Sequence, residues 1–525
     1  MVALMRAPPH RRAPLPPTDA LGLDRKVLER ARASRDPRFD GRFFVAVPST
    51  GVYCRPICPA PVSRRTDVRY FETASAAAEA GFRPCLRCRP EAAPGSAAWL
   101  GTSAVIRRAL RLIEEGALDD ASVERLAARV GTGPRHLHRL FVQHLGASPF
   151  TVAQTRRLHF AKRLLDSTRL PVTRIALEAG FGSSRRFNDA FRHTYGRSPR
   201  EIRRDGGAGR PDRGAIRLRL AYRPPYDWEA LRAFLEARAI PGVERVDELA
   251  YERVITVADG LSAESAGGRA VVRLSPVAGR HELELTVVGA RPGALFPICS
   301  AARRAFDLSA DPALIARAFR GDPLLGPLVR HRPGLRIPGA WDPFECAVRA
   351  VLGQQITVAA ARTLAARLVA RTSPPLPGAR PAHARPGAPA LESAFPSPSA
   401  LASADLSGLG IPGARMAALR TLARAVLDRK LDFGAPPDRV AAALEALPGI
   451  GAWTAQYIAL RALGEPDALP AADIVLRRMA AAGDPPLSPG ALERRTAAWR
   501  PWRSYAVMHL WRAAGERPAD RSERR

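Results

Sequence analysis

Four cysteines grouped within 35 residues constrain this chain more than any other feature of its sequence. They occur as Cys54-Arg-Pro-Ile-Cys58 and then Cys85-Leu-Arg-Cys88, a C-x3-C pair followed by a C-x2-C pair. This spacing supplies the four soft ligands that a tetrahedral Zn²⁺ site requires. Four thiolates around one Zn²⁺ carry a net charge of about −2. Such a site can hold a fold together or supply an activated sulfur nucleophile.

The balance of charge points to a polyanionic partner. The chain contains 81 Lys and Arg residues against 50 Asp and Glu, a formal net charge of +31. Compositional drift from Lys to Arg explains why Lys26, Lys162 and Lys430 are the only lysines. It does not explain the net charge, because acidic residues could have balanced it. With 525 residues, 46% of them hydrophobic, the chain is expected to form three or four globular domains that bind a polyanion such as nucleic acid.

The sequence lacks the features of membrane or secreted proteins. It has no run of 18 apolar residues, and residues 1–20 are rich in Pro and Arg without the apolar core of a signal peptide. We therefore expect a cytoplasmic protein with no membrane partner. In a reducing compartment the cysteine cluster predicts metal binding rather than disulfides, and Cys299 and Cys346 lie far from it in apolar contexts.

Composition and periodicity divide the chain into blocks. A strand-like segment, Arg42–Val47, precedes the cysteines, and the amphipathic stretch Ala74–Gly81 separates the two pairs. Helical spacing then fills 101–204, the alternation of strands begins at Ile216, and helical spacing returns after Pro297. We expect a disordered tail at 1–20, a cysteine domain at 21–93, a helical domain at 101–204, a linker at 205–213, a sheet domain at 214–300, a helical domain at 301–515 with a disordered Pro-rich insertion at 373–399, and a disordered tail at 516–525.

One supersecondary unit occurs twice within 101–204. In each copy an Ala lies four residues before a Gly, Ala127 before Gly131 and Ala176 before Gly180, which allows close helix approach and a tight turn. This is the geometry of a helix-turn-helix, although a plain bundle with a solvated basic face has similar local features. The second helix of each unit carries basic and polar residues on its solvent side, among them Arg135, His138, Arg139, Ser184, Arg185 and Arg186.

The helical block resembles an AraC-type DNA-binding domain over its whole length. The resemblance rests on the two repeated units, with Gly180-Phe181 and Gly196-Arg-Ser-Pro199 in the second. It implies that the six basic and polar residues contact DNA and that the two units enter successive major grooves.

The cysteine block resembles the N-terminal domain of the Ada adaptive-response protein. The matching residues are Asp40-Gly41, Thr50-Gly-Val-Tyr-Cys54-Arg-Pro-Ile-Cys58 and Gly81-Phe-Arg-Pro-Cys85-Leu-Arg-Cys88-Arg-Pro90. The resemblance implies that Cys54 accepts a methyl group from a DNA methylphosphotriester while Cys58, Cys85 and Cys88 remain zinc ligands. Methylation would take the site from about −2 to about −1 and so weaken its repulsion from DNA. A purely structural zinc site is the alternative.

A short glycine turn is the strongest local feature of the C-terminal half. In Leu447-Pro-Gly-Ile-Gly-Ala-Trp-Thr-Ala455, Gly449 and Gly451 free backbone N–H groups that can hold a phosphate at a helix N-terminus. Asp473 follows the turn within Leu-Pro-Ala-Ala-Asp-Ile-Val. An isolated Asp in such a context is more often a helix cap than a catalytic group.

The hairpin and the Asp together resemble the HhH-GPD family of DNA glycosylases. Other segments resemble AlkA-type 3-methyladenine DNA glycosylase II: Arg223-Pro-Pro-Tyr-Asp-Trp228, Pro343-Phe-Glu, Val351-Leu-Gly-Gln-Gln-Ile-Thr357 and Trp499 to Trp511. This resemblance implies that Asp473 stabilises an oxocarbenium-like sugar or orients water. It also implies an aromatic pocket for a flipped cationic base, although core packing is the alternative for these side chains. The implied pocket residues are Trp453, Tyr457, Trp511 and Phe234.

Departures from the family pattern refine these expectations. Bifunctional relatives carry a Schiff-base Lys where this chain has Trp453, so we predict a monofunctional hydrolase without a cofactor. The apolar wedge of some relatives is replaced by Gln355 followed by Ile356, which leaves the intercalating residue open, and Ile474 replaces an aromatic, which leaves the base range open. No Pro-Cys-His-Arg motif occurs, so repair of O6-methylguanine is not expected.

Together these features predict a multidomain α+β protein that is mostly helical. Its parts are a small zinc domain, a double helix-turn-helix, a small antiparallel-sheet domain and an all-α helix-hairpin-helix glycosylase domain. We expect an alkylation-damage regulator and repair enzyme that binds one Zn²⁺ and double-stranded DNA, recruits RNA polymerase and acts as a monomer. The rival interpretations are a regulator whose glycosylase half is inactive, and a glycosylase joined to a zinc domain that transfers no methyl group.

Overall fold

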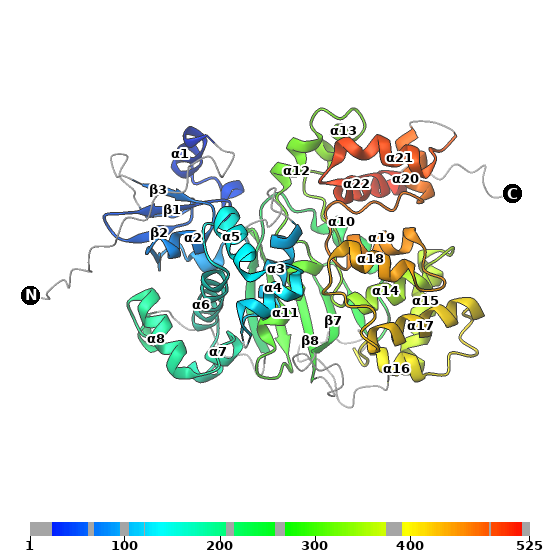
Figure 1. Cartoon of the computed structure of the whole chain (residues 1–525), viewed down its shortest axis with the longest axis horizontal. Coiled ribbons are helices and arrows are strands. Elements are labelled where there is room, and N and C mark those ends of the chain that lie inside the picture. Colours follow the sequence, from blue (N-terminus) through cyan, green and yellow to red (C-terminus); the bar gives the residue numbers. More distant parts are fainter. Residues whose placement is uncertain are drawn as a thin grey trace, which may run out of the picture. The chain divides into compact units, whose positions relative to one another are not determined.

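The computed structural model describes residues 24–60, 68–94, 104–119, 121–205, 215–257, 268–373, 391–481 and 485–516 (Figure 1). The chain divides into two compact units. The N-terminal unit comprises Met1–Asp166 and Leu170–Ala208, and the C-terminal unit comprises Ser167–Arg169 and Gly209–Arg525. Within the described residues, no helix is both long and apolar enough to cross a membrane.

The cysteines lie in a small region built on a four-stranded sheet of order β3-β1-β2-β4. Strand β1 is buried along its whole length because both faces of the sheet are covered. Val45 and Val47 pack with Leu28 of the first helix, whereas Phe44 and Ala46 pack with the second helix. The elements are α1 (Arg25–Ala33), β1 (Phe44–Val47), β2 (Val52–Cys54), β3 (Arg69–Phe71), α2 (Ala74–Glu79) and β4 (Arg83–Pro84).

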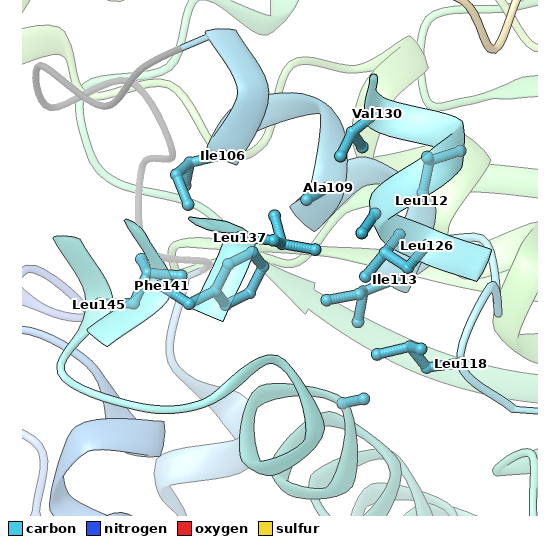
Figure 2. Packing of buried hydrophobic residues seen from close by; sticks show 12 residues of the cluster. Ile106, Ala109, Leu112, Ile113, Leu118, Leu126, Val130, Leu137, Phe141 and Leu145 are labelled. Carbon is cyan, nitrogen blue, oxygen red and sulfur yellow. The ribbon is translucent and has the colours of Figure 1, made fainter. Parts of the chain in front are cut away.

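Seven helices follow within the N-terminal unit. Leu137, Phe141 and Leu145 recur at helical spacing on one face of α5 and bury that face in an apolar cluster shared with α3 and α4 (Figure 2). The helices are α3 (Ala104–Glu114), α4 (Val123–Val130), α5 (Pro134–Leu145), α6 (Pro149–Ser167), α7 (Val172–Glu178), α8 (Ser184–Tyr195) and α9 (Pro199–Asp205). The turns expected at Gly131 and Gly180 follow α4 and α7, so the two repeated units correspond to the helix pairs α4–α5 and α7–α8.

The C-terminal unit begins with a five-stranded antiparallel sheet of order β5-β9-β8-β7-β6. Alternate apolar residues face the core: Leu218 and Leu220 on β5, and Leu283 and Leu285 on its neighbour β9, are fully buried. The elements are β5 (Ala215–Ala221), α10 (Trp228–Glu236), β6 (Glu244–Val246), β7 (Tyr251–Val257), β8 (Gly268–Pro276) and β9 (Glu282–Val288).

The rest of the C-terminal unit is helical. Helix α14 is buried on nearly all sides, because its apolar residues from Phe344 to Leu352 face several neighbouring helices at once. The helices are α11 (Leu295–Ala305), α12 (Pro312–Phe319), α13 (Leu325–His331), α14 (Pro343–Leu352), α15 (Val358–Thr372), α16 (Pro398–Ser403), α17 (Gly413–Leu427), α18 (Pro437–Glu445), α19 (Ala452–Arg461), α20 (Ile474–Ala481), α21 (Pro489–Arg495) and α22 (Arg503–Glu516).

The expected disordered insertion at 373–399 differs from the structure at its C-terminal end. Leu391 and Ala394 are buried against Val254 of β7, and the N–H groups of Glu392 and Ser393 donate to the carbonyl of Gly242. The Pro-rich composition hides these two apolar anchors, so the segment from 391 belongs to the fold. Residues 374–390, like the expected tail at 1–20, lie outside the described residues. The first residue of the other expected tail, Glu516, closes α22.

Candidate functional site

The four cysteines converge because β2 and β4 pair in parallel. Tyr53 lies opposite Pro84 in this pairing, and the N–H of Cys85 donates to the carbonyl of Tyr53 at 2.9 Å. Cys54 ends β2, Cys58 follows in the next turn, and Cys85 and Cys88 follow β4. All four Sγ atoms lie within 4.8 Å of one another. Zn–S bonds of about 2.3 Å in a tetrahedron separate the sulfurs by about 3.8 Å, so the cluster has the size and the donor set of a closed zinc site.

A partly buried arginine supports the cysteine cluster. The N–H of Arg55 donates to Sγ of Cys88 at 3.3 Å, and its guanidinium donates to the Cys88 carbonyl at 3.2 Å. The guanidinium also forms an ion pair with the buried carboxylate of Asp40, whose Oδ1 lies 2.8 Å from Nε. Arg55, the residue after Cys54, therefore holds Cys88 of the second cysteine pair in place through both its N–H and its guanidinium.

The zinc region packs against α6, which joins the two helix-turn-helix pairs. The hydroxyl of Tyr53, the neighbour of Cys54, forms a hydrogen bond of 2.8 Å with Nε2 of His159 on α6. Burial, with help from Arg163 and Lys162, lowers the pKa of His159 to about 3, so the imidazole is neutral in the folded protein. The residue next to Cys54 is therefore tied directly to the DNA-binding region.

The two helix-turn-helix pairs present their second helices to solvent. Gly131 and Gly180 adopt φ of +78° and +80°, a conformation that disfavours a residue with a Cβ and that turns the chain sharply after the first helix of each pair. The predicted contact residues Arg135, His138 and Arg139 on α5 and Arg185 and Arg186 on α8 are exposed, and Ser184 is partly exposed.

A cavity of about 880 Å³ brings the predicted pocket residues of the C-terminal unit together. Trp453 and Tyr457 on α19 are stacked with ring centroids 5.3 Å apart, and Trp511 on α22 lies 6.1 Å beyond Tyr457. Phe234 on α10 and Asp473 line the same cavity, as does Ile356. A volume of this size lies within the range of small-molecule pockets, about 300–1,000 Å³.

Both carboxylate oxygens of Asp473 are held in place. Oδ1 accepts the N–H of Leu476 at 3.0 Å and so caps α20, and Oδ2 accepts the indole N–H of Trp453 at 3.0 Å. Oδ1 thus serves as the helix cap, while Oδ2 faces the aromatic residues of the cavity, so the cap does not exclude a catalytic role. The hydrogen bond from Trp453 therefore fixes the carboxylate of Asp473 relative to the aromatic wall formed by Trp453, Tyr457 and Trp511.

The glycine turn joins α18 to α19 and precedes Trp453, which lines the cavity. Gly449 has a φ of +84°, and a Cβ there would lie 2.9 Å from that of Ala418, so both backbone angle and space require glycine. Gly451 is the N-cap of α19, where exposed N–H groups begin a helix. The side chain of Gln354 donates to the carbonyl of Gly449 at 2.9 Å and to the hydroxyl of Thr454 at 3.0 Å, which fixes the segment before Gln355 to the hairpin.

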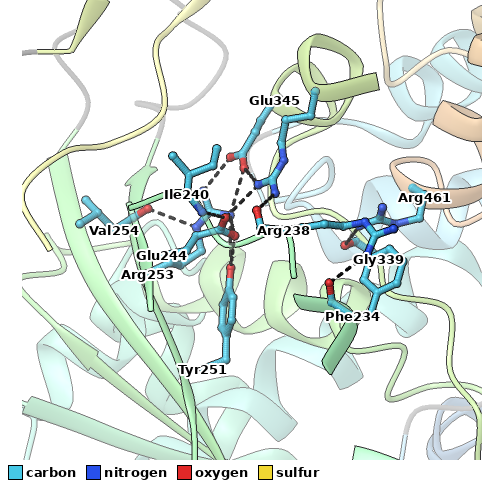
Figure 3. A network of polar contacts seen from close by, with 11 residues as sticks. Phe234, Arg238, Ile240, Glu244, Tyr251, Arg253, Val254, Gly339, Glu345 and Arg461 are labelled. Carbon is cyan, nitrogen blue, oxygen red and sulfur yellow. Dashed lines mark hydrogen bonds and ion pairs between the residues drawn. The ribbon is translucent and has the colours of Figure 1, made fainter. Parts of the chain in front are cut away.

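The deep wall of the cavity contains a buried ring of charges that sequence analysis missed (Figure 3). Glu345 accepts from Arg253 at 2.6 Å and from Arg349 at 2.9 Å, and Glu244 accepts from Arg349 at 2.9 Å and from the hydroxyl of Tyr251 at 2.7 Å. Two arginines and two glutamates neutralise each other. The ring connects β6 and β7 of the sheet with α14 of the helical region.

Neutralising Glu244 is expected to loosen this ring. Burial alone would raise the pKa of Glu244, but Arg349 and Arg253 outweigh burial and lower it to about 2. We expect Glu244→Gln to reduce the free energy of unfolding of the C-terminal unit by about 3 kcal/mol at pH 7, because it leaves buried arginines under-compensated. The folded pKa lies below the unfolded value, so the wild-type advantage must vanish as the pH falls from about 4.5 to 2. Urea unfolding followed by tryptophan fluorescence measures this, and a difference that is constant down to pH 2 would contradict it.

Four models of known domains match the chain. They are the AlkA N-terminal domain at residues 217–342, the metal binding domain of Ada at 28–91, a helix-turn-helix domain at 126–205, and the HhH-GPD superfamily base excision DNA repair protein at 348–503. The chain is also 41% identical to the probable bifunctional transcriptional activator/DNA repair enzyme AlkA of Mycobacterium tuberculosis over 488 residues, 92% of this chain and 95% of that protein. The chain belongs to this bifunctional family.

Two further relatives match the two halves of this family member separately. The chain is 35% identical to DNA-3-methyladenine glycosylase 2 of Escherichia coli K12 over 57% of its own length and 98% of the relative. It is 38% identical to the bifunctional transcriptional activator/DNA repair enzyme Ada of the same organism over 33% of its length and 47% of the relative. The predicted class is confirmed: this is a DNA-binding repair enzyme and transcription regulator with a zinc site, a helix-turn-helix region and a helix-hairpin-helix glycosylase domain.

Two residues that line the cavity belong to no recognisable sequence motif in this chain. Arg238 follows α10 and Arg461 ends α19, and both line the cavity. Arginine is so frequent in this chain that neither position stood out. Arg238 follows Phe234 by four residues, and Arg461 follows Tyr457 by four residues. This spacing places two side chains on one face of a helix, and it was the only pattern in the sequence that could have indicated these arginines.

Proposed function

We propose that residues 21–93 repair the DNA backbone by a single methyl transfer to Cys54. The sulfur of Cys54 bonds to the methyl carbon, the methyl–oxygen bond breaks, and the phosphate leaves as a diester anion. Bound zinc would keep the four sulfurs deprotonated at neutral pH. The convergence of the cysteines and the N–H that Arg55 donates to Sγ of Cys88 support this proposal. Cys58, Cys85 and Cys88 would not react and would remain ligands of the metal.

Methylation of Cys54 would act as the switch for sequence-specific DNA binding by residues 101–204. The charge of the site changes from about −2 to about −1, which lowers its repulsion from phosphates. The exposed residues of α5 and α8 would then contact the major groove, with Arg135, Arg139, Arg185 and Arg186 as the charged contacts and His138 and Ser184 as polar contacts. We further propose that the protein works in the cytoplasm as a monomer and recruits RNA polymerase at its promoter sites.

We propose that residues 214–515 excise alkylated bases such as 3-methyladenine and 7-methylguanine. This part comprises a sheet domain to residue 300 and a helical domain beyond it. The observation that carries this proposal is the cavity that brings the four predicted aromatic side chains together with the carboxylate of Asp473. An extruded cationic base would stack on the rings of Trp453, Tyr457 and Trp511, whose π-faces attract positive charge. The ring of Phe234, which Arg238 and Arg461 already contact, would line the pocket beside them. Asp473 would stabilise the positive sugar as the C1′–N bond breaks, and water would then bond to C1′.

The rim of the cavity is suited to hold DNA in this reaction. Gly449 and Gly451 would present backbone N–H groups to a phosphate without sequence preference. Gln355 adopts a φ of +57° at an exposed turn, and its neighbour Ile356 is exposed and lines the cavity. We propose that this pair fills the space that the extruded nucleotide leaves in the duplex.

Base release without strand cleavage tests the proposed activity. Among the described residues that line the cavity there is no lysine, and Trp453 occupies the position of the Schiff-base lysine. We therefore expect the wild type to release free 7-methylguanine from methylated duplex DNA and to leave intact abasic sites. Chromatography of the free base and denaturing gels of the strand measure both. Strand scission by the enzyme alone, abolished in Asp473→Asn, would contradict the monofunctional mechanism.

A further inference from the structure

Two arginines line the cavity without an acidic partner. Arg461 donates to the hydroxyl of Tyr457 at 2.6 Å and to two backbone carbonyls of the segment before α14. Arg238 donates to the carbonyl of Phe234 at 3.2 Å. In the part of the chain that the structure describes, no carboxylate lies within ion-pair distance of either guanidinium, in contrast to the neutralised ring that contains Arg253.

Both guanidinium groups lie over the ring of Phe234 (Figure 3). Their central carbons are 3.7 Å from the ring centroid for Arg238 and 4.6 Å for Arg461. A cation–π contact holds a cation against a ring but does not cancel its charge. Burial, assisted by nearby Arg461, lowers the pKa of Arg238 to about 10, so it remains protonated at neutral pH. This end of the cavity therefore carries uncompensated positive charge.

The opposite charge lies at the other end of a continuous series of contacts. Asp473 accepts from the indole of Trp453, Trp453 stacks on Tyr457, and the hydroxyl of Tyr457 accepts from Arg461. Negative charge is thus fixed at one end of the aromatic wall and positive charge at the other. A base that enters between them experiences a field directed along the wall.

We propose that Arg238 and Arg461 drive departure of the base by opposing positive charge on it, while Asp473 attracts positive charge onto the sugar. When the C1′–N bond breaks, its electron pair stays on the base, so a cationic alkylpurine leaves neutral and the sugar becomes positive. A water oxygen then bonds to C1′ and loses a proton to solvent. The two arginines repel the bound cationic base but not the departing neutral one, and this difference accelerates the step. The inference rests on the glycosylase activity proposed above.

The test separates charge from structure by comparing rate with affinity. Single-turnover release of 7-methylguanine from duplex DNA is measured at increasing enzyme concentration, which yields a maximal rate and an apparent Kd. For Arg461→Gln and for Arg238→Gln we expect the maximal rate to fall roughly tenfold and the cationic base to bind about threefold more tightly. Arg461→Lys keeps the charge and should stay within about threefold of the wild-type rate. Arg367→Gln, which removes an arginine bonded to the carbonyl of Leu409 away from the cavity, is the matched control.

Each outcome has a distinct meaning. A slower rate with tighter binding in both Gln variants supports the proposal, because a damaged pocket would weaken binding. A slower rate with weaker binding, or an Arg461→Lys variant as slow as Arg461→Gln, would overturn it and leave the glycosylase activity intact. A wild-type protein that releases no base would overturn both the proposed function and this inference.

Discussion

Asp473→Asn is expected to slow single-turnover release of alkylated base on the order of a thousandfold. Asparagine is nearly isosteric with aspartate, but its one amide oxygen can replace only one of the two carboxylate oxygens that accept from Trp453 and Leu476. Its side chain is also a good N-cap for α20. The substitution therefore removes the negative charge that faces the developing sugar cation, together with one hydrogen bond that the carboxylate accepts. Quench-flow or manual sampling with 3-methyladenine duplex and excess enzyme measures the rate.

The chain offers a closely matched control for this substitution. Asp322 also accepts an indole N–H, from Trp499 at 2.6 Å, and also caps a turn by accepting the N–H groups of Leu324 and Leu325. It does not line the cavity. Asp322→Asn should therefore change the excision rate by less than about threefold, with any small loss appearing in stability instead. Equal rates for wild type and Asp473→Asn would assign Asp473 to the helix cap alone.

Loss of one metal ligand is expected to unfold the zinc region. The four strands around the cysteines are two to four residues long, and among the described residues two small apolar clusters pack against their sheet. A structural zinc site contributes on the order of 10 kcal/mol to folding, more than so small a core supplies. In Cys88→Ser, or after chelation of the metal, we expect amide hydrogens of β1 and β2 to lose their protection from exchange in the intact chain.

Two internal references make this experiment decisive. Helix α14, buried in the C-terminal unit, should keep its protection in every sample. Cys346→Ala removes a buried cysteine outside the cluster and should leave the zinc region protected. Persistent protection of β1 and β2 in Cys88→Ser after chelation would show that the fold does not depend on the metal.

Local patterns in the sequence predicted the elements that short-range physics determines. The glycine positions Gly131 and Gly180 marked the helix turns, the alternation that begins at Ile216 marked β5, and the spacing of Cys54 to Cys88 marked the metal site. Each depends on residues close together in the chain, where helix and strand periods fix which side chains share a face.

Features that depend on distant residues escaped prediction. Arg238 and Arg461 are more than 200 residues apart in sequence and meet only because α10 and α19 face one cavity. The ring of Glu244 and Glu345 likewise unites the sheet with α14. The contact of Tyr53 with His159 joins two blocks that the sequence treated separately. Buried charge partners carry no periodic pattern, so a single sequence does not reveal them.

The most direct test of the central claim, that the zinc region detects alkylation rather than only holding a fold, is peptide mass mapping of the zinc-loaded protein after incubation with methylphosphotriester DNA. The account predicts one methyl group on Cys54 and none on Cys58, Cys85 or Cys88, with about tenfold tighter DNA binding by the methylated protein. A zinc-loaded protein with no methyl group on Cys54, or with the methyl group on another of the four cysteines, would contradict it.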